Sequence, residues 1–227
     1  MIERMTVGPI GENVYVLPFD SKTSLDKEGS PCLLVDPGDE AARILEFLES
    51  RRLELRCVVL THGHLDHTAA LPALYAAWES KGAARPPLAI HGEDLRYLGP
   101  EAEEANRETF TAIRAIGFFK HYSAPMPSAD LVLGDGDFVA GSGWRVLHSP
   151  GHTAGSICLY EADLGVLVSG DTLFRDGVGR TDGPDSSARA LEKSIAGRLF
   201  SLPAETLVYP GHGEPTSIGR ERDGAIE

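Results

Sequence analysis

The sequence predicts a layered α/β protein whose strands form mixed sheets. Short apolar runs bounded by glycine, proline or aspartate recur along the 227 residues, as expected of buried strands. Helical patterns occur before, between and after these runs. Because the two kinds of element do not alternate regularly, a mixed sheet arrangement is favoured over a doubly wound parallel sheet.

The chain opens with two short apolar runs and a helical pattern. Each run is bounded by turn residues, and Asp36-Pro37-Gly38 stops the second one. Ile44, Leu45 and Leu48 share one face at helical spacing. We therefore expect, in order, a strand at Val14–Leu17, a strand at Cys32–Val35 and a helix from an N-cap at Asp39 to about Arg51.

The middle of the chain combines a strand, a histidine-rich loop and helical stretches. Arg56–Leu60 indicates a strand, which is followed by a polar loop. Beyond the loop we expect a helix to about Trp78, a short strand at Ala89–Ile90 and helical structure around Glu101–Ile116.

The last part of the chain contains further strands and one more helix. Leu191, Ile195 and Leu199 lie four residues apart, as on the buried face of a helix capped by Asp185 or Ser186. We interpret residues 1–227 as a single domain with a polar tail at 218–227. The expected strands are Asp137–Ala140, Trp144–His148, Ser156–Tyr160, Gly165–Ser169 and Thr206–Tyr209.

The charge of the chain argues against two classes of partner. Acidic residues outnumber basic ones 34 to 21, giving a net charge of −13. A nucleic-acid backbone and an anionic membrane surface both attract a basic face, so we expect neither as a partner. The start of the sequence lacks the pattern of a signal peptide, and no apolar run approaches the length of a membrane span. We expect a cytoplasmic protein.

The cysteines indicate a reducing compartment. Cys32, Cys57 and Cys158 stand alone in apolar runs, and an odd number at wide spacing is not a disulfide framework. We interpret them as buried, inert thiols.

The strongest chemical signal is the run Thr61-His62-Gly63-His64-Leu65-Asp66-His67. So many imidazole and carboxylate groups in so few residues are rare without a metal ion. His62 and His64 are two residues apart, so an extended loop points both the same way. Asp66 and His67 are adjacent, at the start of the next helix, and point elsewhere. This geometry can serve two neighbouring metal ions.

Three further candidates share one context. His152, Asp171 and His212 each lie on a glycine-marked loop just after an expected strand. Each alone is typical of a surface or capping residue, but together with the first run they complete a site of five histidines and two aspartates. We interpret the remaining histidines, His91, His121 and His148, as structural.

The His-x-His-x-Asp-His run at 62–67, followed by His152, Asp171 and His212 at these separations, resembles the motifs of the metallo-β-lactamase superfamily. The resemblance covers nearly the whole chain. The segments Gly177–Asp182 and Pro210–Glu214 resemble its glyoxalase II (hydroxyacylglutathione hydrolase) branch, in particular the short bacterial YcbL-like members. The resemblance implies a four-layer αββα sandwich of two mixed β-sheets flanked by helices, with the metals at one edge. It also implies the ligand sets: His62, His64 and His152 for one metal, Asp66, His67 and His212 for the other, and Asp171 as a bridge.

The expected chemistry follows from such a centre. Nitrogen and carboxylate ligands suit two divalent ions, zinc first, with iron or manganese as alternatives. Two ions roughly 3.5–4 Å apart can share a water, and bound zinc lowers the pKa of water to about 7. We expect the bridging hydroxide to be the nucleophile, with Asp66 as the catalytic side chain that orients it. Asp36 is a candidate hydrogen-bond acceptor for a ligand histidine.

The resemblance implies hydrolysis of a thioester, S-D-lactoylglutathione, to D-lactate and glutathione. Arg180 stands where the glyoxalase II branch has a basic residue near a glutathione carboxylate. The C-terminal helical domain that supplies much of the glutathione grip in full-length members is not expected here. Phe118, Phe119, Lys120 and Tyr122 are candidates for a flap, with packing as the alternative.

Three other interpretations stay open. One is a mononuclear iron persulfide dioxygenase, which shares the metal motif and the Gly-Arg-Thr-Asp segment around Arg180. Another is a different hydrolase of the superfamily, such as a lactonase. The third is a metal-binding protein without catalysis.

Overall fold

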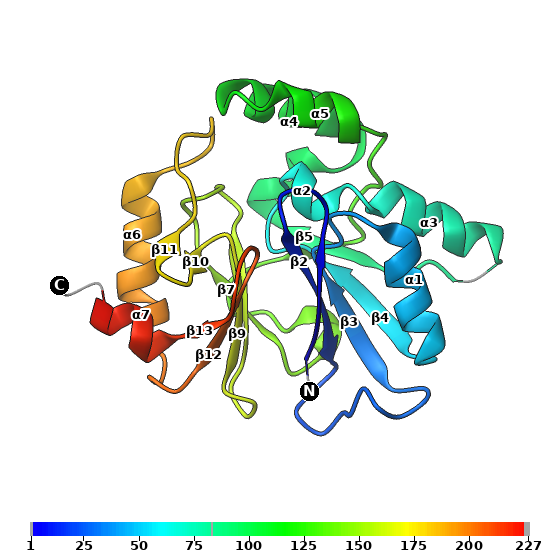
Figure 1. Cartoon of the computed structure of the whole chain (residues 1–227), viewed down its shortest axis with the longest axis horizontal. Coiled ribbons are helices and arrows are strands. Elements are labelled where there is room, and N and C mark those ends of the chain that lie inside the picture. The colour runs from blue at the N-terminus through cyan, green and yellow to red at the C-terminus, as the bar shows by residue number, and fades with distance from the viewer. Residues whose placement is uncertain (1, 83, 225–227) are drawn as a thin grey trace.

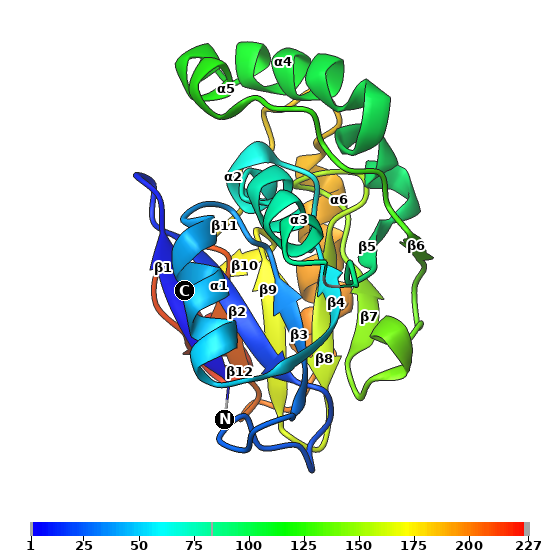
Figure 2. The same cartoon turned by 90° about the vertical axis from the view of Figure 1, so that its right-hand side faces the viewer.

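The computed structural model describes residues 2–82 and 84–224 and contains two mixed β-sheets that face each other (Figure 1, Figure 2). The first sheet has six strands in the order β1-β2-β3-β4-β5-β6. The β1, β2 and β3 strands pair antiparallel, and β3 to β6 pair parallel. Its strands are β1 (Glu3–Val7), β2 (Glu12–Pro18), β3 (Pro31–Val35), β4 (Glu54–Val59), β5 (Leu88–His91) and β6 (Leu131–Leu133).

The second sheet has five strands in the order β13-β12-β9-β8-β7. Only β12 and β9 pair parallel within it. Its strands are β7 (Arg145–His148), β8 (Ile157–Glu161), β9 (Val166–Gly170), β12 (Leu207–Pro210) and β13 (Thr216–Ser217). A separate hairpin follows β9 and consists of β10 (Leu173–Phe174) and β11 (Gly177–Val178).

Helices cover the outer faces of both sheets, and α4 and α5 lie across the top of Figure 1. On the first sheet lie α1 (Ala41–Ser50), α2 (Leu65–Thr68) and α3 (Leu71–Ser80). The second sheet carries α6 (Ala188–Gly197) and α7 (Ile218–Gly224). The top helices are α4 (Ala102–Ala112) and α5 (Ile116–Tyr122). Four 3₁₀ turns complete the described elements: η1 (Gly92–Tyr97), η2 (Gly99–Glu101), η3 (Val139–Gly141) and η4 (Leu199–Ser201).

Alternation along the strands divides the core into layers. In β2, Tyr15 and Leu17 point into the cluster between the sheets, whereas Val14 and Val16 point toward the helices on the outer face. The second sheet repeats the pattern, with an outer apolar cluster that includes Leu191 of α6. The expected αββα arrangement of two mixed sheets flanked by helices is therefore confirmed.

Most of the expected strands are present, but Asp137–Ala140 is not one of them. That segment contains the η3 turn, in which Ala140 adopts a left-handed conformation with φ of 49°. Only Phe138 makes an isolated bridge, to Arg145. The preceding strand is β6, whose exposed Leu131 and Val132 give no alternating pattern in the sequence.

The helix boundaries differ from expectation at several points. Glu40, not Asp39, precedes α1, and it does so in a left-handed conformation without a side-chain cap. The helix expected up to Trp78 is split into α2 and α3, because Pro72 in the first turn of α3 has no N–H to continue the preceding helix.

Two differences occur near the end of the chain. Ser187, rather than Asp185 or Ser186, caps α6 by accepting a hydrogen bond from the Ala190 amide. The expected polar tail is wrong for 218–224, which form α7 with Ile218 buried in the outer core of the second sheet. Residues 225–227 of that tail lie outside the described residues.

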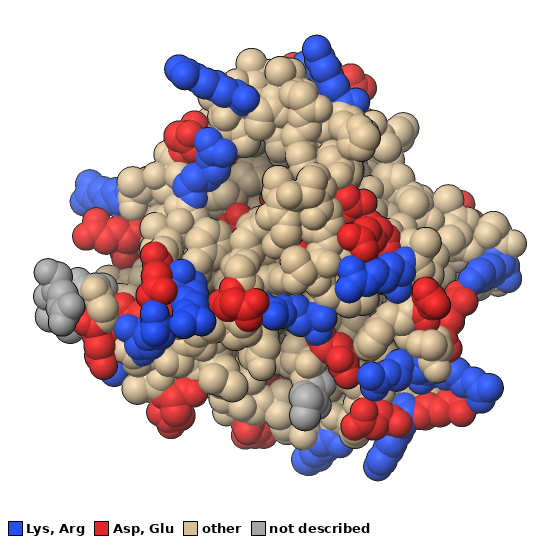
Figure 3. Space-filling model, viewed as in Figure 1, with Lys and Arg blue, Asp and Glu red and all other residues tan. Residues whose placement is uncertain are grey.

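The surface mixes charges of both signs. Figure 3 shows basic and acidic side chains side by side over much of one face, with a mostly uncharged area in its upper part. Ion pairs of the protein surface include Arg4–Glu214 and Arg52–Glu28. Among the residues that the structure describes, the helices are too short or too polar to cross a lipid bilayer.

Candidate metal centre

The expected site residues all follow the ends of strands. In sheets of this kind the carboxyl ends of neighbouring strands deliver their loops to one edge, where ligands bind. The first sheet contributes two loops and the second contributes three. Asp36 follows β3, the 62–67 run follows β4, His152 follows β7, Asp171 follows β9 and His212 follows β12.

Three histidines from both sheets form the first group. One ring nitrogen each of His62, His64 and His152 lies within 4.8 Å of the others. The three residues are buried, with 1%, 6% and 2% of their surface exposed. His64 Nδ1 and His152 Nε2 face each other at 2.9 Å, so these two nitrogens point into the same space.

The second group also combines the two sheets and is more open. Ligand atoms of Asp66, His67 and His212 lie within 4.8 Å of one another. Asp66 Oδ2 lies 3.3 Å from His212 Nε2 and 3.6 Å from His67 Nε2. His67 is fully buried, whereas the side chains of Asp66 and His212 remain 14% and 24% exposed. Solvent therefore reaches the centre on this side.

Asp171 lies between the two groups. Its Oδ1 is 3.4 Å from His67 Nε2, and its Oδ2 is 3.6 Å from His152 Nε2. Oδ2 is also 3.8 Å from His212 Nε2. One carboxylate thus faces side chains of both groups, which is the arrangement that a bridging ligand requires.

The surroundings of the first group favour neutral histidine side chains. Burial, followed by the neighbouring histidines, lowers the pKa of His62 well below its ordinary value. Burial lowers the pKa of His64 to about 3, and the charge on His152 adds to this effect. Neutral imidazole is the form that binds a metal ion.

The surroundings of Asp66, His67 and Asp171 favour their charged forms. Burial opposes ionisation of Asp66, yet His67 and His212 together hold its pKa at about 2. The pKa of Asp171 also lies well below its ordinary value, because His67 outweighs the effect of burial. For His67 itself, burial is outweighed by Asp171 and Asp66, which raise its pKa. The charged forms of His67 and of these two carboxylates therefore favour one another.

The donor set passes a direct test for metal binding. Buried polar atoms normally have hydrogen-bond partners, and those without one require an explanation. His62 and His67 each have a buried Nε2 without a partner, and so does Asp171 Oδ1. These three atoms belong to side chains that converge on one point of the fold. The residues present therefore fit divalent metal ions with nitrogen and oxygen ligands.

Gly211 allows the two sheets to approach closely at this point. A Cβ at position 211 would lie 2.3 Å from Asp171 Oδ1 and 2.7 Å from His67 Cε1. No larger residue fits there unless one of these side chains moves. This close approach explains the glycine directly before His212.

Asp36 orients the 61–67 loop. Its Oδ1 accepts from the Thr61 amide at 2.7 Å, and its Oδ2 accepts from Thr61 Oγ1 at 2.6 Å. Oδ2 also lies 3.1 Å from His67 Nδ1, so that ring can donate to it and keep Nε2 free. The structure thus places Asp36 against a candidate ligand histidine.

Glu12 is a member of this neighbourhood that sequence reasoning missed. Its Oε1 lies 3.8 Å from His67 Nδ1, and neither carboxyl oxygen has a hydrogen-bond partner. Burial raises the pKa of Glu12 well above its ordinary value, and nearby carboxylates add to this. The available signal was its register in β2, where Glu12 lies on the same face as Val14 and Val16, which are buried against the outer helices.

Arg180 lies beside the centre, but its side chain has a partner. Nε and NH2 donate to the two oxygens of Asp182 at 2.6 and 2.7 Å. The Arg180 carbonyl accepts from His152 Nδ1 at 2.9 Å, which leaves Nε2 of that ring for a metal ion. Position 180 thus has a backbone contact to a candidate ligand and an exposed guanidinium that forms an ion pair.

Aromatic rings form a wall beside the first group. Phe110 of α4 lies edge-on to His64 with ring centroids 6.4 Å apart, and it stacks on Phe118 at 5.4 Å. Phe118 in turn stacks on Tyr122, whose hydroxyl donates to Asp39 at 2.9 Å. The α4–α5 segment is therefore anchored over the centre, with Phe119 and Phe110 in the core and Lys120 exposed.

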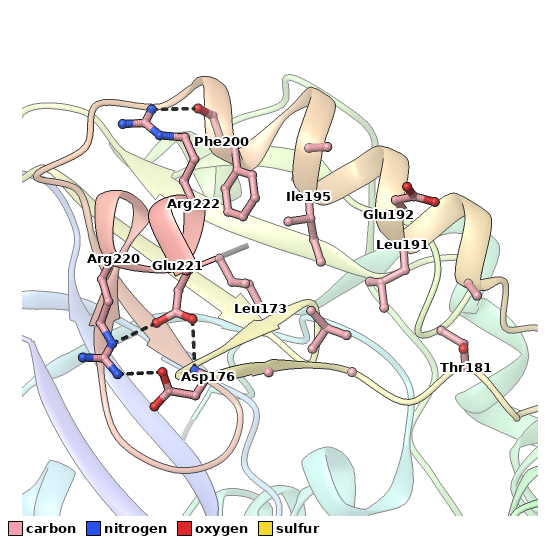
Figure 4. A pocket seen from close by; sticks show the side chains of 16 residues that line it. Leu173, Asp176, Thr181, Leu191, Glu192, Ile195, Phe200, Arg220, Glu221 and Arg222 are labelled. Carbon is pink, nitrogen blue, oxygen red and sulfur yellow. Dashed lines mark hydrogen bonds and ion pairs between the residues drawn. The ribbon is translucent and has the colours of Figure 1, made fainter. Parts of the chain in front are cut away.

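A groove of about 1200 Å³ lies away from these ligands (Figure 4). It runs between α6, the β10–β11 hairpin and α7, and its walls include Leu173, Ile195 and Phe200. At one end, Arg220 pairs with Asp176 and Glu221. None of the candidate metal ligands lines this groove, so the chemistry belongs to the cluster rather than to the larger hollow.

The remaining histidines and cysteines lie outside the groups that can hold a metal among the described residues. His91 and His148 stack with centroids 4.0 Å apart. All three cysteines are free and buried, and burial raises the pKa of each thiol, to about 12 for Cys32 and Cys57 and about 11 for Cys158.

Comparison with known proteins gives concordant results. The family model described as "Metallo-beta-lactamase superfamily" matches residues 20–212. The chain is 32% identical to the "Probable metallo-hydrolase YqgX" of Bacillus subtilis over 97% of this chain and 93% of that protein. It is 30% identical to the "Hydroxyacylglutathione hydrolase GloC" of Haemophilus influenzae over 92% of this chain and 95% of that protein.

A solved structure supports both the fold and a metal centre in a relative. The structure of "TTHA1623 in a di-iron-bound form" superimposes with a TM-score of 0.77 at 33% sequence identity. The alignment covers 97% of this chain and 96% of that one.

Proposed function

The chain belongs to the metallo-β-lactamase superfamily, and from this premise we propose that it is a binuclear metal-dependent thioester hydrolase. The proposed substrate is S-D-lactoylglutathione. The observation that carries the proposal is the single cluster in which Asp171 faces both groups of candidate ligands. The GloC relative, named as a hydroxyacylglutathione hydrolase, supports this substrate class.

We assign the ligands by these groups. One ion is assigned to the three histidines of the buried group and the other to the more open group, with Asp171 shared. When bound, two divalent ions would supply an activated water at neutral pH and a Lewis acid for the thioester carbonyl. Nitrogen-rich sites of this kind favour zinc, with iron or manganese as alternatives. The ligand groups are His62, His64 and His152 for the first ion and Asp66, His67 and His212 for the second.

The side chains of the protein have further tasks. Asp66 is the proposed catalytic residue, because its carboxylate is ionised and partly exposed on the open side of the centre, where it can accept a hydrogen bond from water. Asp36 and the carbonyl of Arg180 fix the ring orientations of His67 and His152. The Phe110–Phe118–Tyr122 wall offers an apolar surface against which a substrate can lie.

Arg180 is the proposed contact for a carboxylate of the glutathione moiety. Its guanidinium is half exposed and already paired with Asp182, so substrate binding would share or replace that ion pair. The likeness to GloC and this cation together support a glutathione conjugate, whereas the overall negative charge of the chain does not attract one.

The test combines metal analysis with a panel of thioesters. Protein loaded with zinc, iron or manganese is given S-D-lactoylglutathione and smaller thioesters, and the released thiol is measured. We expect turnover that depends on two metal equivalents and is lost in His62→Ala but kept in the control His121→Ala, an exposed histidine outside the cluster. Absence of thiol release with every metal would refute the proposal. Oxygen consumption with a persulfide and a single iron would instead identify a dioxygenase.

A further inference from the structure

A buried carboxylate in η1 connects the two loops that carry the first histidine group. Asp94 has no exposed surface. Its Oδ2 accepts from the Gly63 amide at 2.9 Å and from Thr153 Oγ1 at 2.8 Å, and its Oδ1 accepts from the Gly155 amide at 2.7 Å. The donors thus come from two loops that are far apart in the sequence and belong to different sheets.

The position of these donors relates Asp94 to the candidate ligands. Gly63 lies between His62 and His64, and Thr153 directly follows His152. Asp94 therefore holds the backbone beside the three histidines through hydrogen bonds to Gly63, Thr153 and Gly155 rather than to their rings. We propose that Asp94 is a positioning residue that holds these three histidines in register for one metal ion.

Close packing around Asp94 shows that the contact is built into the fold. A Cβ at position 155 would lie 2.5 Å from Asp94 Oδ1, and one at position 63 would lie 2.4 Å from the Tyr97 ring. Tyr97 follows Asp94 by three residues, on the same 3₁₀ turn, and its ring lies edge-on to His64 with centroids 5.6 Å apart. Both glycines are therefore needed for η1 to approach the loops.

A carboxylate suits this position better than an amide. The three donors require two oxygen acceptors, whereas asparagine offers one oxygen and places an NH₂ group against an N–H or hydroxyl donor. Burial raises the pKa of Asp94 to about 6 against the opposing effect of its three hydrogen bonds, so the group is ionised at neutral pH. Asp94→Asn therefore preserves the volume and removes the acceptor pattern.

The experiment isolates each metal group in turn. The inference rests on the ligand assignment proposed above, but its readout is zinc affinity and does not require turnover. In His212→Ala only the first ligand group is complete. In His152→Ala only the second ligand group is complete. In each background the protein is prepared once with Asp94 and once with Asp94→Asn. The zinc dissociation constant of each of the four proteins is measured by competition with a chromophoric chelator.

We expect Asp94→Asn to weaken zinc binding about 10- to 100-fold in the His212→Ala background, as is usual when a group that orients metal ligands is removed. In the His152→Ala background the change should stay below about 3-fold. The control is Glu161→Gln, which alters another buried carboxylate that accepts a backbone N–H, in β8 and outside the ligand groups. It should leave zinc affinity unchanged in both backgrounds.

Thr153→Val keeps the test decisive if Asp94→Asn does not fold. It removes one donor to Asp94 and should weaken zinc binding only in the His212→Ala background, by about 3- to 10-fold. Equal effects in both backgrounds, or none, would overturn the positioning role while leaving the proposed function intact. If the proteins that keep Asp94 bind zinc in neither background, both proposals are overturned together.

Discussion

Asp171→Ala should damage the centre more than any other single carboxylate substitution in it. The Asp171 carboxylate faces His67, His152 and His212 at 3.4, 3.6 and 3.8 Å, so its removal affects both ligand groups. Asp66 faces only members of the open group. On the proposed ligand assignment, removal of Asp171 should therefore weaken both metal sites, whereas removal of Asp66 should weaken one.

The magnitude follows from the charge and burial of the Asp171 carboxylate. A charge-assisted interaction in a buried site contributes about 1.5–3 kcal/mol, equivalent to about 10- to 150-fold in affinity. Because the proposed bridge makes one such interaction at each of the two sites, we expect kcat/KM at limiting zinc to fall about 10²- to 10⁴-fold in Asp171→Ala. The decreases in Asp66→Ala and His67→Ala should each be about 10- to 100-fold smaller. Asp171→Asn should lie between, because its oxygen retains the position but not the charge.

The assay measures bound metal and thioester turnover on the same samples. Zinc content is determined at a fixed concentration of free zinc, and kcat/KM is determined from thiol release. Asp163→Ala, an exposed aspartate in the β8–β9 turn, serves as the control and should behave as the unmodified protein. If Asp171→Ala keeps two zinc equivalents and loses no more activity than Asp66→Ala, the reasoning from the bridging position is wrong.

The same geometry predicts four other outcomes. Fully loaded protein should contain two metal equivalents, because seven candidate ligands exceed what one tetrahedral ion can use; elemental analysis showing one equivalent after zinc, iron or manganese loading would contradict this. Arg180→Ala should raise KM for S-D-lactoylglutathione about 5- to 20-fold with little change in kcat, because the guanidinium is partly exposed and the backbone carbonyl is retained; an equal effect on a small neutral thioester would make Arg180 structural. Gly211→Ala should lower metal affinity and activity at least about 100-fold, because the new Cβ would lie 2.3 Å from Asp171 Oδ1. The control Gly177→Ala, whose Cβ would have nothing within 4 Å, should change neither quantity. Finally, burial raises the pKa of Asp94 to about 6, so between pH 4 and pH 6 the folded chain holds a proton that the unfolded chain has released. As the pH rises from 4 to 7, the free energy of unfolding of the metal-free protein should therefore fall, by up to about 3 kcal/mol more than that of Asp94→Asn. Urea unfolding at the two pH values measures this, and equal changes in both proteins would refute it.

The candidate ligands could be found in the sequence because each has a local signature. The 62–67 run is dense in histidine, and His152, Asp171 and His212 each stand after an apolar run and a glycine. This shared context joined them to the first run as one candidate site, and the resemblance to the superfamily implied that the site lies at one edge of the two sheets. Asp36, in the segment Val35-Asp36-Pro37-Gly38, was a candidate acceptor for a ligand histidine, and the structure places it directly after β3 and 3.1 Å from His67 Nδ1.

The residues that were missed act through contacts between distant segments. Nothing in Gly92-Glu93-Asp94 distinguishes the buried Asp94 from the acidic residue beside it, since the difference is made by donors from Gly63 and Gly155. The strand β13 has only two residues and exists through its pairing with β12. The α7 helix resembles a polar tail in the sequence, because only Ile218 marks its buried face.

Each ligand group draws on both sheets, and this relates the site to the fold. His62, His64, Asp66 and His67 come from the first sheet, and their partners His152 and His212 come from the second. Hydrogen bonds already join the sheets at this edge, because the Asn13 amide donates to the Gly211 carbonyl and the Tyr15 hydroxyl donates to the Pro210 carbonyl. A metal ion bound in either group would therefore join the two sheets at the same edge. Because the unfolded chain offers no such convergence, binding energy gained there also stabilises the folded state.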